Sequence, residues 1–382
     1  MKTTLFLSIS LMSASISNAQ PGQPKPSGPA ISPKLEQVAE FGKHQPIGVG
    51  VSKEKRIFIT FPKMPENYDY GLAEIVPRTG GPVERRPYPN AEWNQWDSLN
   101  PQNRFMNVQA LFVDQTDALW VLDPSNPGEE PPIVAGIKLL KINLVTNQVE
   151  KIYRFEDLPR ERTALNDVRV DTRRQVAYLS DPKRSAIVVL DLTTGKSRSL
   201  LEGDKSTSAD PEFKLIIDGK EVKDNKGKSF SSNVNGIALT DDFRYLYYRA
   251  INQTKLYRIA TEYLNNPALT PAQVTSRVET MAETGVSHGM TSDAKGNVYL
   301  TDSPTKAVRY LTPGRSAGAV DSPDGKLETL VRDSRLLWPD SFAVGPDGYL
   351  YLTAAQIHRT KKYNDGQDKV DYPFRLYRMK LP

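Results

Sequence analysis

The feature that most constrains the fold of this chain is a hairpin pattern that occurs six times. In residues 287–302, SHGMTSDAKGNVYLTD, a short apolar strand leads through a polar turn into an alternating strand built on an aromatic residue, which is typical of a β-hairpin. The copies recur every 52 to 69 residues and align on Phe58, Trp120, Tyr178, Tyr247, Tyr299 and Tyr351. A strand-rich repeat of this length predicts one four-stranded antiparallel blade per copy, and therefore an all-β, six-bladed propeller.

Two further segments predict how the ring of blades closes. Residues 35–41, LEQVAEF, alternate and precede the first hairpin, and residues 374–379, FRLYRM, follow the last one. We expect them to pair in one blade, because an unpaired strand would expose its backbone and invite aggregation. A closed ring of repeats is a single cooperative unit, so residues 35–382 are predicted to form one domain.

The first 34 residues have a different character. Lys2 precedes the apolar run LFLSISLM and the small residues around Ala19, which is typical of a cleavable secretory signal peptide over residues 1–19. The apolar run is shorter than the ~20 residues that span a bilayer. The proline-rich residues 20–34 predict an extended tether. We therefore expect export to the periplasm or the extracellular space, without membrane insertion.

Composition excludes several classes of function. The chain has no cysteine, which excludes disulfides, thiolate catalysis and cysteine-ligated metals. Its 50 Lys and Arg residues are scattered among 45 Asp and Glu residues, a pattern that predicts no nucleic-acid partner. We found no P-loop, dinucleotide fingerprint, serine hydrolase elbow or HExxH motif. We expect a monomer whose partner is a small molecule.

The register of the repeat predicts a ring of equivalent side chains. Counting back from each aromatic to the start of the preceding strand gives Ile47, Gln109, Asn166, Asn235, His288 and Asp340. The innermost strands of a propeller run along its channel, so these residues should converge at one mouth. Polar groups converging in a concavity favour a ligand site. The alternative is that they bind only channel water.

His288 and Asp340 are the predicted catalytic pair. Histidine titrates near neutrality and can transfer protons, and the carboxylate of Asp340 would orient it. Asp167 is another candidate carboxylate. We expect Gln109, Asn166 and Asn235 to hold the ligand. The aspartates that follow the second strands, Asp123, Asp181 and Asp302, recur and are therefore read as turn formers.

Two insertions interrupt the repeats. Residues 83–97 contain Tyr88, Trp93 and Trp96, so we expect an ordered, functional loop that covers one mouth of the channel and contributes Trp93 and Trp96 to ligand binding. The same tryptophans suit a protein-binding surface. Residues 203–232 are polar and contain a predicted small hairpin at FKLIIDGKEV.

Taken together, these motifs resemble the major royal jelly protein and Yellow family, in a bacterial version. The resemblance covers the chain from Leu35 onward and rests on RIFITFPK, PYPNAEW, VQALFVDQTDALWVLDPS, NDVRVDTRRQVAYLSD, HGMTSDAKGNVYLTD and LLWPDSFAVGPDGYLYLTAAQIHR. It implies a secreted six-bladed propeller with a pocket at the channel mouth. In some members of the family this pocket binds small aromatic amines, and some members are linked to dopachrome conversion.

A more distant resemblance is to gluconolactonase and senescence marker protein 30, which hold a channel metal on acidic residues and asparagines. Asn166 and Asn235 match the asparagines of that site. Ile47 or Gly48 and His288 stand where the family has acidic ligands, and calcium depends on carboxylates for much of its affinity. The resemblance therefore implies no metal cofactor of the lactonase type, although Asp340 could complete a divalent site with Asn166 and Asn235.

Three functions follow as hypotheses. The first is a Yellow-like propeller that binds a small polar or aromatic ligand and, if catalytic, is a dopachrome-tautomerase-like isomerase working by proton transfer. The second is a metal-assisted lactonase. The third is a non-enzymatic envelope scaffold. Fold alone does not separate them.

Overall fold

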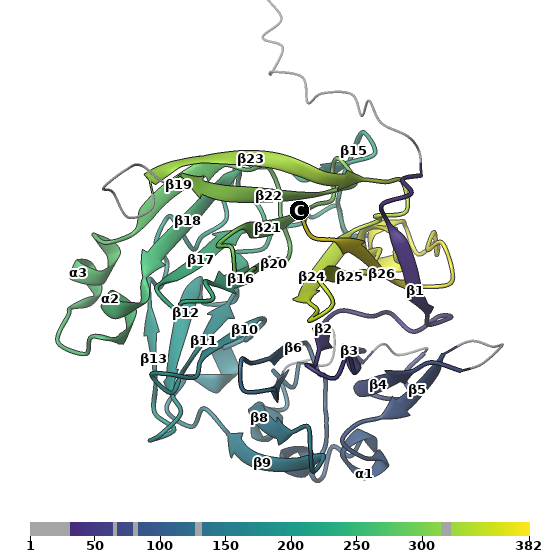
Figure 1. Ribbon diagram of the computed structural model, residues 1–382, viewed down its shortest axis with the longest axis horizontal. Coiled ribbons are helices and arrows are strands. Elements are labelled where there is room, and N and C mark those ends of the chain that lie inside the picture. The colour runs from purple at the N-terminus through teal and green to yellow at the C-terminus, as the bar shows by residue number, and fades with distance from the viewer. Residues whose placement is uncertain (1–30, 64–66, 79–82, 127–131, 315–321) are drawn as a thin grey trace, which may run out of the picture.

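A computed structural model describes residues 31–63, 67–78, 83–126, 132–314 and 322–382. Six four-stranded antiparallel sheets surround a central axis (Figure 1). The predicted six-bladed propeller is thereby confirmed. The predicted signal peptide and residues 20–30 of the predicted tether lie outside the described residues. At the end of that tether, Ser32 is buried, and its backbone N–H donates to the Asp333 carboxylate at 2.6 Å.

The first three blades follow the chain from the inside of the ring to the outside. Blade one contains β2 (Val49–Val51), β3 (Ile57–Thr60), β4 (Leu72–Val76) and β5 (Glu84–Pro87). Blade two contains β6 (Ala110–Val113), β7 (Ala118–Asp123), β8 (Lys138–Asn143) and β9 (Gln148–Tyr153). Blade three contains β10 (Val168–Asp171), β11 (Val176–Asp181), β12 (Ala186–Asp191) and β13 (Ser197–Leu200).

The remaining blades complete the ring. Blade four contains β16 (Val234–Leu239), β17 (Tyr245–Ala250), β18 (Lys255–Ala260) and β19 (Glu279–Glu283). Blade five contains β20 (Met290–Ser292), β21 (Val298–Asp302), β22 (Ala307–Gly314) and β23 (Ser322–Arg332). Blade six contains β24 (Pro339–Val344), β25 (Tyr349–Ala354), β26 (Arg375–Lys380) and the N-terminal β1 (Glu36–Glu40).

Blade six closes the ring as the sequence predicts. β1 pairs antiparallel with β26, with Glu36 opposite Arg378 and Glu40 opposite Arg375. The backbone N–H of Phe41 also donates to the Phe374 carbonyl at 2.8 Å. The N-terminal strand β1 therefore covers the edge that β26 would otherwise expose.

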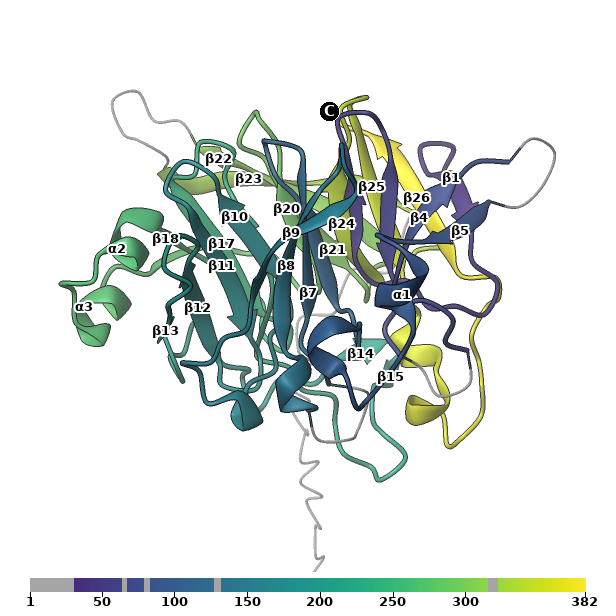
Figure 2. The ribbon, with the colours of Figure 1, turned by 90° about the horizontal axis from the view of Figure 1, so that it is seen from below.

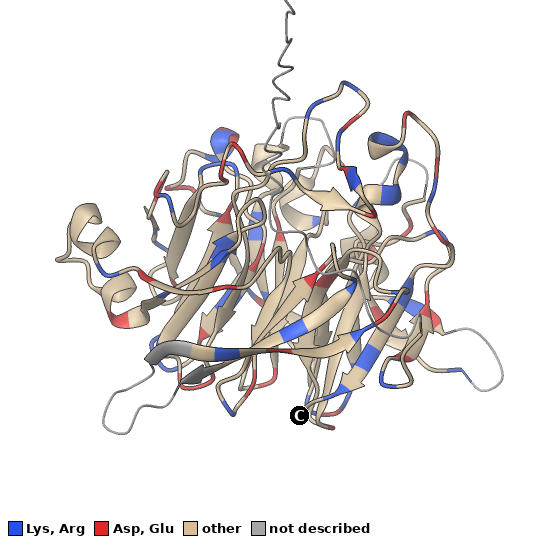
Figure 3. Cartoon of the chain, turned by 90° about the horizontal axis from the view of Figure 1, so that it is seen from above, with Lys and Arg blue, Asp and Glu red and all other residues tan. Residues whose placement is uncertain are grey.

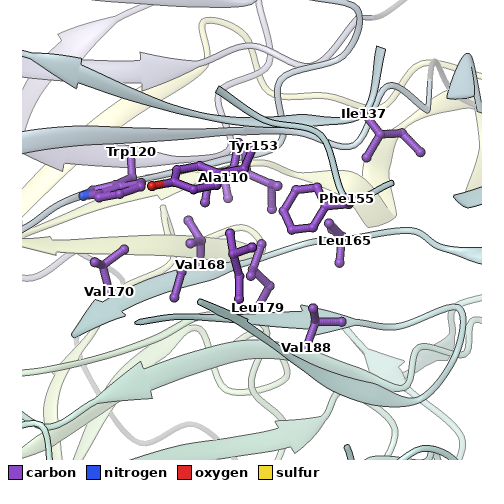
Figure 4. Close-up of a cluster of buried hydrophobic side chains, with 14 of the residues drawn as sticks. Ala110, Trp120, Ile137, Tyr153, Phe155, Leu165, Val168, Val170, Leu179 and Val188 are labelled. Atoms are coloured by element: carbon purple, nitrogen blue, oxygen red, sulfur yellow. The ribbon is translucent and has the colours of Figure 1, made fainter. Parts of the chain in front are cut away.

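The core lies between neighbouring blades. Figure 4 shows one such layer, in which Trp120 of blade two and Val168 of blade three belong to the same cluster. The aromatic that marks each repeat is buried in these layers, and in three blades its polar tip donates to an aspartate of the preceding turn. Trp120 Nε1 bonds Asp114 at 2.8 Å, and Tyr299 Oη bonds Asp293 at 2.7 Å. The bond explains why tyrosine and tryptophan recur at this position.

Short helices occupy the connections between strands. They are α1 (Ala91–Asn94), α2 (Thr261–Asn265) and α3 (Pro271–Thr275), together with the 3₁₀ turns η1 (Pro101–Asn103), η2 (Val134–Gly136), η3 (Arg160–Arg162), η4 (Ile357–Arg359) and η5 (Lys361–Tyr363). In the described part of the chain, no helix has the length and apolar character needed to cross a membrane. Basic and acidic residues are interspersed over the blades (Figure 3).

The predicted hairpin of the second insertion is present as β14 (Ile216–Ile217) and β15 (Lys220–Glu221). It lies on the same side of the ring as α1 and the turns η4 and η5 (Figure 2). Its apolar side chains join those at the blade ends in one buried group, the cap cluster, made of Ile47, Leu215, Ile217, Val222, Ile251, Val286, Trp338 and Ala355. The insertion therefore covers part of one mouth of the channel.

Candidate functional site

The predicted ring residues stand at the starts of the innermost strands, and four of them are half-buried. These four are Gln109, Asn166, Asn235 and Asp340. Gln109 Nε2 of blade two donates to Asn166 Oδ1 of blade three at 3.3 Å. The other two ring positions are buried: Ile47 is a member of the cap cluster, and His288 packs against its member Trp338. We call the half-buried side of this mouth the open side and the buried side the capped side.

Glycines bring the ring positions of blades four, five and six together. A Cβ on Gly236 would lie 2.4 Å from the His288 carbonyl oxygen, and one on Gly289 would lie 1.8 Å from the Asp340 carbonyl oxygen. Real Cβ atoms do not approach so closely, so any larger residue would push the blades apart. These glycines directly follow the ring residues of their blades, so the close approach places Asn235, His288 and Asp340 on adjacent strands.

A row of hydroxyl groups ties neighbouring blades to each other at the same level. Thr60 Oγ1 donates to the Gln109 carbonyl at 3.1 Å, and Thr353 Oγ1 donates to the Ile47 carbonyl at 2.6 Å. Ser180 makes the corresponding bond to the Asn235 carbonyl. We did not predict these residues, although a signal was present, since each follows the repeat aromatic by two positions.

Asp340 is the ring residue whose pKa lies closest to neutrality. Burial raises its pKa to about 7, and the negative charge of Asp167 contributes to the rise. Its carboxylate accepts a hydrogen bond from the adjacent Ser341 hydroxyl at 3.2 Å, and a hydrogen bond from the Trp338 side chain also lowers its pKa. Asp167 is more firmly held, because its carboxylate accepts from Arg169 at 2.7 Å and from the Ile237 backbone at 3.0 Å.

His288 does not have the environment that the sequence led us to expect. Its side chain is 2% exposed, and burial together with the positive charge of Arg249 lowers its pKa to about 3. Neither imidazole nitrogen has a hydrogen-bond partner among the described residues. No hydrogen bond from His288 to the Asp340 carboxylate is therefore present, and our prediction that Asp340 orients His288 is wrong in this respect.

The imidazole of His288 packs against Trp338 instead. The two rings stack with centroids 4.0 Å apart and an interplanar angle of 22°. Trp338 also stacks on His358 at 5.8 Å, and it adopts a left-handed backbone conformation with φ of 56°. Such a conformation is costly for a bulky residue and persists only where the surroundings enforce it. The capped side is thus an apolar aromatic stack, which explains why His288 stays neutral.

Trp93 and Trp96 lie elsewhere than expected. Trp93 packs on Phe105 at 5.3 Å, and Lys63 Nζ sits 3.2 Å from the centre of the Trp96 ring. Helix α1, which contains Trp93, is at the outer rim of the ring of blades (Figure 1), and Trp96 follows it by two residues. Among the described residues, no hydrogen bond or ring contact joins either tryptophan to the ring residues, and Trp93 packs in the core cluster around Phe58 and Phe105. The cap cluster, from the other insertion, takes the covering role that we had given to this loop.

The far mouth of the channel contains a cavity of about 300 Å³. Phe112 and Phe342 line it together with Asp241. Arg169 forms part of its wall and also lines a void of about 20 Å³ next to Gly289. Because the Arg169 guanidinium bonds Asp167 and the Met290 carbonyl, both at 2.7 Å, it stands between the two ends of the channel.

The remaining candidates have contacts that suit a structural role. Asp123 is fully buried and accepts from the Met106 and Asn107 backbones and from Lys138. Asp302 accepts from the Thr305 backbone at 3.1 Å. Both agree with turn formation. Among the described residues, no three His, Asp or Glu side chains are grouped so that they could hold a metal ion.

Comparison with solved structures shows the same fold. A luciferin-regenerating enzyme superposes with a TM-score of 0.54 and 15% identity, covering 91% of this chain and 95% of that chain. Regucalcin from Agrobacterium tumefaciens, a calcium-binding protein, superposes with a TM-score of 0.51 and 13% identity, covering 91% of this chain and 96% of that chain. At these identities the likeness extends to the fold alone.

Sequence comparison identifies the family. Major royal jelly protein 1 of Apis mellifera is 26% identical over 195 residues, covering 48% of this chain and 42% of that protein. The Yellow-related salivary protein M10 of Phlebotomus duboscqi is 23% identical over 236 residues, covering 56% of each. The chain thus spans about half the length of these relatives. The family model for major royal jelly proteins matches residues 106–381, and the chain therefore belongs to the major royal jelly protein family.

Proposed function

We propose that this protein binds a small polar or aromatic molecule at the open side of the ring mouth and, as a catalyst, transfers a proton within it. One observation carries the proposal: Gln109, Asn166, Asn235 and Asp340 of separate blades are all half-buried at one mouth, next to an apolar cap. A few polar groups beside an apolar wall are the usual composition of a small-molecule site.

In the proposed reaction, Asp340 is the proton-transfer group. A carboxyl whose pKa lies near the working pH can both accept and donate a proton. In a tautomerisation, Asp340 removes a proton from one substrate atom and returns it to another, so that no electron acceptor is required. The amides of Gln109 and Asn166 would hold substrate oxygen or nitrogen atoms. The family resemblance suggests dopachrome as the first substrate to test.

The binding half of the proposal is tested by replacing ring amides. We expect Gln109→Leu and Asn166→Leu to weaken binding of dopamine, used as a probe, by about tenfold or more, because each leaves a polar group of the ligand unpaired. Gln115→Leu removes an amide at the far mouth and is the matched control. Calorimetric titration measures all three. Equal losses in the control, or none in the ring variants, would place the ligand elsewhere.

Metal-assisted lactone hydrolysis is the second candidate. It is favoured by the two asparagine side chains and the Asp340 carboxylate at one mouth, since oxygen ligands suit hard divalent cations. Elemental analysis of the purified protein, followed by lactone hydrolysis with and without a chelator, tests it. Stoichiometric calcium together with chelator-sensitive hydrolysis would favour this candidate over proton transfer.

A scaffold function would use the loop around α1. Trp96 is 37% exposed and Leu99 is 93% exposed, which is uncommon for large apolar side chains. Affinity capture with the wild-type protein and with Trp96→Ala would test the scaffold function. Partners that the variant loses, together with no binding of a small ligand, would favour a scaffold.

We further propose that the protein is an exported monomer. Cell fractionation would test the export, and light scattering would test the oligomeric state.

A further inference from the structure

We propose that blade five holds a second ligand site, separate from the channel, that binds the carboxylate or phosphate group of a small anion. The site is a cavity of about 230 Å³ formed by the turn between β21 and β22, the outer strands β22 and β23, and residues 285–286. In Figure 1 these outer strands lie at the edge of the ring, away from the axis.

Two arginines in the cavity wall supply the charge. Arg309 Nη1 donates to the Thr284 carbonyl at 3.0 Å and lies 3.7 Å from the Asp302 carboxylate. Arg332 is half-buried, and its Nε is buried without a hydrogen-bond partner among the described residues. A buried donor left unpaired is costly. An anion in the cavity would give the Arg332 Nε the partner that it lacks and would give the Arg309 guanidinium a further acceptor.

A third arginine lies directly behind the wall. Arg249 is 1% exposed and donates to Thr284 Oγ1 at 2.7 Å, so it meets Arg309 at the same threonine. No carboxylate forms an ion pair with Arg249 among the described residues, although Asp302 and the exposed Glu283 act on it at longer range. Buried positive charge near a cavity raises the local anion concentration.

The single carboxylate of the wall does not neutralise these cations. Asp302 faces both Arg309 and Arg332, yet burial outweighs their effect and raises its pKa. Two guanidinium groups therefore lie near Asp302 and a third acts on it at longer range, while burial disfavours the ionised form of this single carboxyl. An external anion would have to compete with Asp302, so the strength of this competition can be tested by mutation.

The shape and the remaining lining narrow the class of ligand. Val286 and Pro304 are apolar wall residues, and the Thr305 hydroxyl lies beside the Asp302 carboxylate. The volume of about 230 Å³ is roughly that of eight water molecules at about 30 Å³ each. A small organic acid fits this combination, with its carboxylate on the arginines and its body on the apolar wall, and a phosphate shares the anionic chemistry.

Calorimetric titration of the full chain with benzoate and with inorganic phosphate, at low chloride, tests the site. We expect at least one of the anions to bind, and Arg332→Gln and Arg309→Gln each to weaken that binding by at least about tenfold. Binding of benzoate alone assigns an organic acid, and binding of phosphate alone assigns a phosphate. Arg184→Gln is the matched control, because Arg184 lies in the equivalent turn of blade three and is paired with Glu202.

Asp302→Asn gives a result of opposite sign. It removes the competing charge while keeping an oxygen acceptor for the Thr305 backbone, so anion affinity should rise by severalfold. This variant also serves if either arginine variant fails to fold. No binding of either anion to the wild-type protein, or binding that both arginine variants and Asp302→Asn leave unchanged, would overturn the proposal.

Discussion

His288 and Asp340 occupy equivalent positions in neighbouring blades, yet the two sides of the mouth give them different chemistry. On the capped side, burial holds His288 neutral, with a pKa of about 3. On the open side, partial burial beside Asp167 raises the pKa of Asp340 to about 7. Desolvation disfavours charge in both cases, which lowers the pKa of a base and raises that of an acid. The same physical effect thus moves the pKa of His288 out of the physiological range and moves the pKa of Asp340 into it.

The largest difference between the two sides should appear in turnover. We expect Asp340→Asn to lower the rate of dopachrome conversion by about 10²- to 10⁴-fold, the usual contribution of a general acid or base. His288→Phe keeps a ring to stack on Trp338 and should stay within a few-fold of the wild-type rate. Steady-state kinetics on both variants measures this contrast. If His288→Phe lost as much activity as Asp340→Asn, His288 would also take part in turnover, and the contrast between the two sides would be wrong.

The capped side should matter more for stability. Trp338 is a buried member of the cap cluster and stacks on two imidazoles, so Trp338→Ala should cost about 3–5 kcal/mol of unfolding free energy. Trp96→Ala removes the same side chain from an exposed position and should cost no more than about 1 kcal/mol. Denaturant unfolding measures both. Similar losses of unfolding free energy in the two variants would mean that the cap cluster contributes little to the stability of the protein.

The raised pKa of Asp340 has a consequence for stability with a definite sign. A carboxyl that ionises less readily in the folded state adds stability below about pH 4, and this is lost as pH rises through about 7. Asp340→Asn should therefore be more stable than wild type above pH 7, by at most about 4 kcal/mol, and equally stable near pH 3. Urea unfolding at several pH values measures the difference. A difference in unfolding free energy between the two proteins that did not change with pH would contradict the raised pKa of Asp340.

His288 should contribute with the opposite sign. Its lowered pKa means that the stability present above pH 6.5 is lost as pH falls toward 3. The same series of urea measurements on His288→Phe should therefore show the variant gaining on wild type as the solution becomes acidic.

The smallest expected effect concerns the hydroxyl groups that tie the blades together. Thr353→Val leaves the buried Ile47 carbonyl without its 2.6 Å hydrogen bond and should cost about 1–3 kcal/mol. Thr146→Val changes an exposed turn and should stay within about 0.5 kcal/mol. Thermal unfolding of the pair compares them. No excess loss in Thr353→Val would show that these bonds are replaceable by water.

The blade count, the closure by β1 and β26 and the ring register could be predicted because they depend on local periodicity. A strand signal repeats at nearly constant spacing, and the first residue of each inner strand then follows by counting. The glycines at 236 and 289 and the hydroxyls at 60, 180 and 353 were visible in the same alignment and could have been found.

The division of the mouth into two sides could not be predicted from the repeat. It depends on the hairpin β14 and β15 folding back over the blade ends and burying Ile217 with Trp338, a contact between residues more than a hundred positions apart. The position in the repeat determines where the backbone of a residue lies in the ring. Burial by the insertion determines the pKa of its side chain and the groups that it contacts. For that reason His288 looked catalytic in the sequence, while its nitrogens are without partners in the fold.

A pH titration of the side-chain carboxyl carbons by nuclear magnetic resonance, with Asp340 assigned from Asp340→Asn, tests the account most directly. It predicts an Asp340 midpoint near pH 7 and no titration of the His288 ring between pH 5 and 8. An Asp340 midpoint near 4, or a His288 midpoint near 6.5, would contradict it.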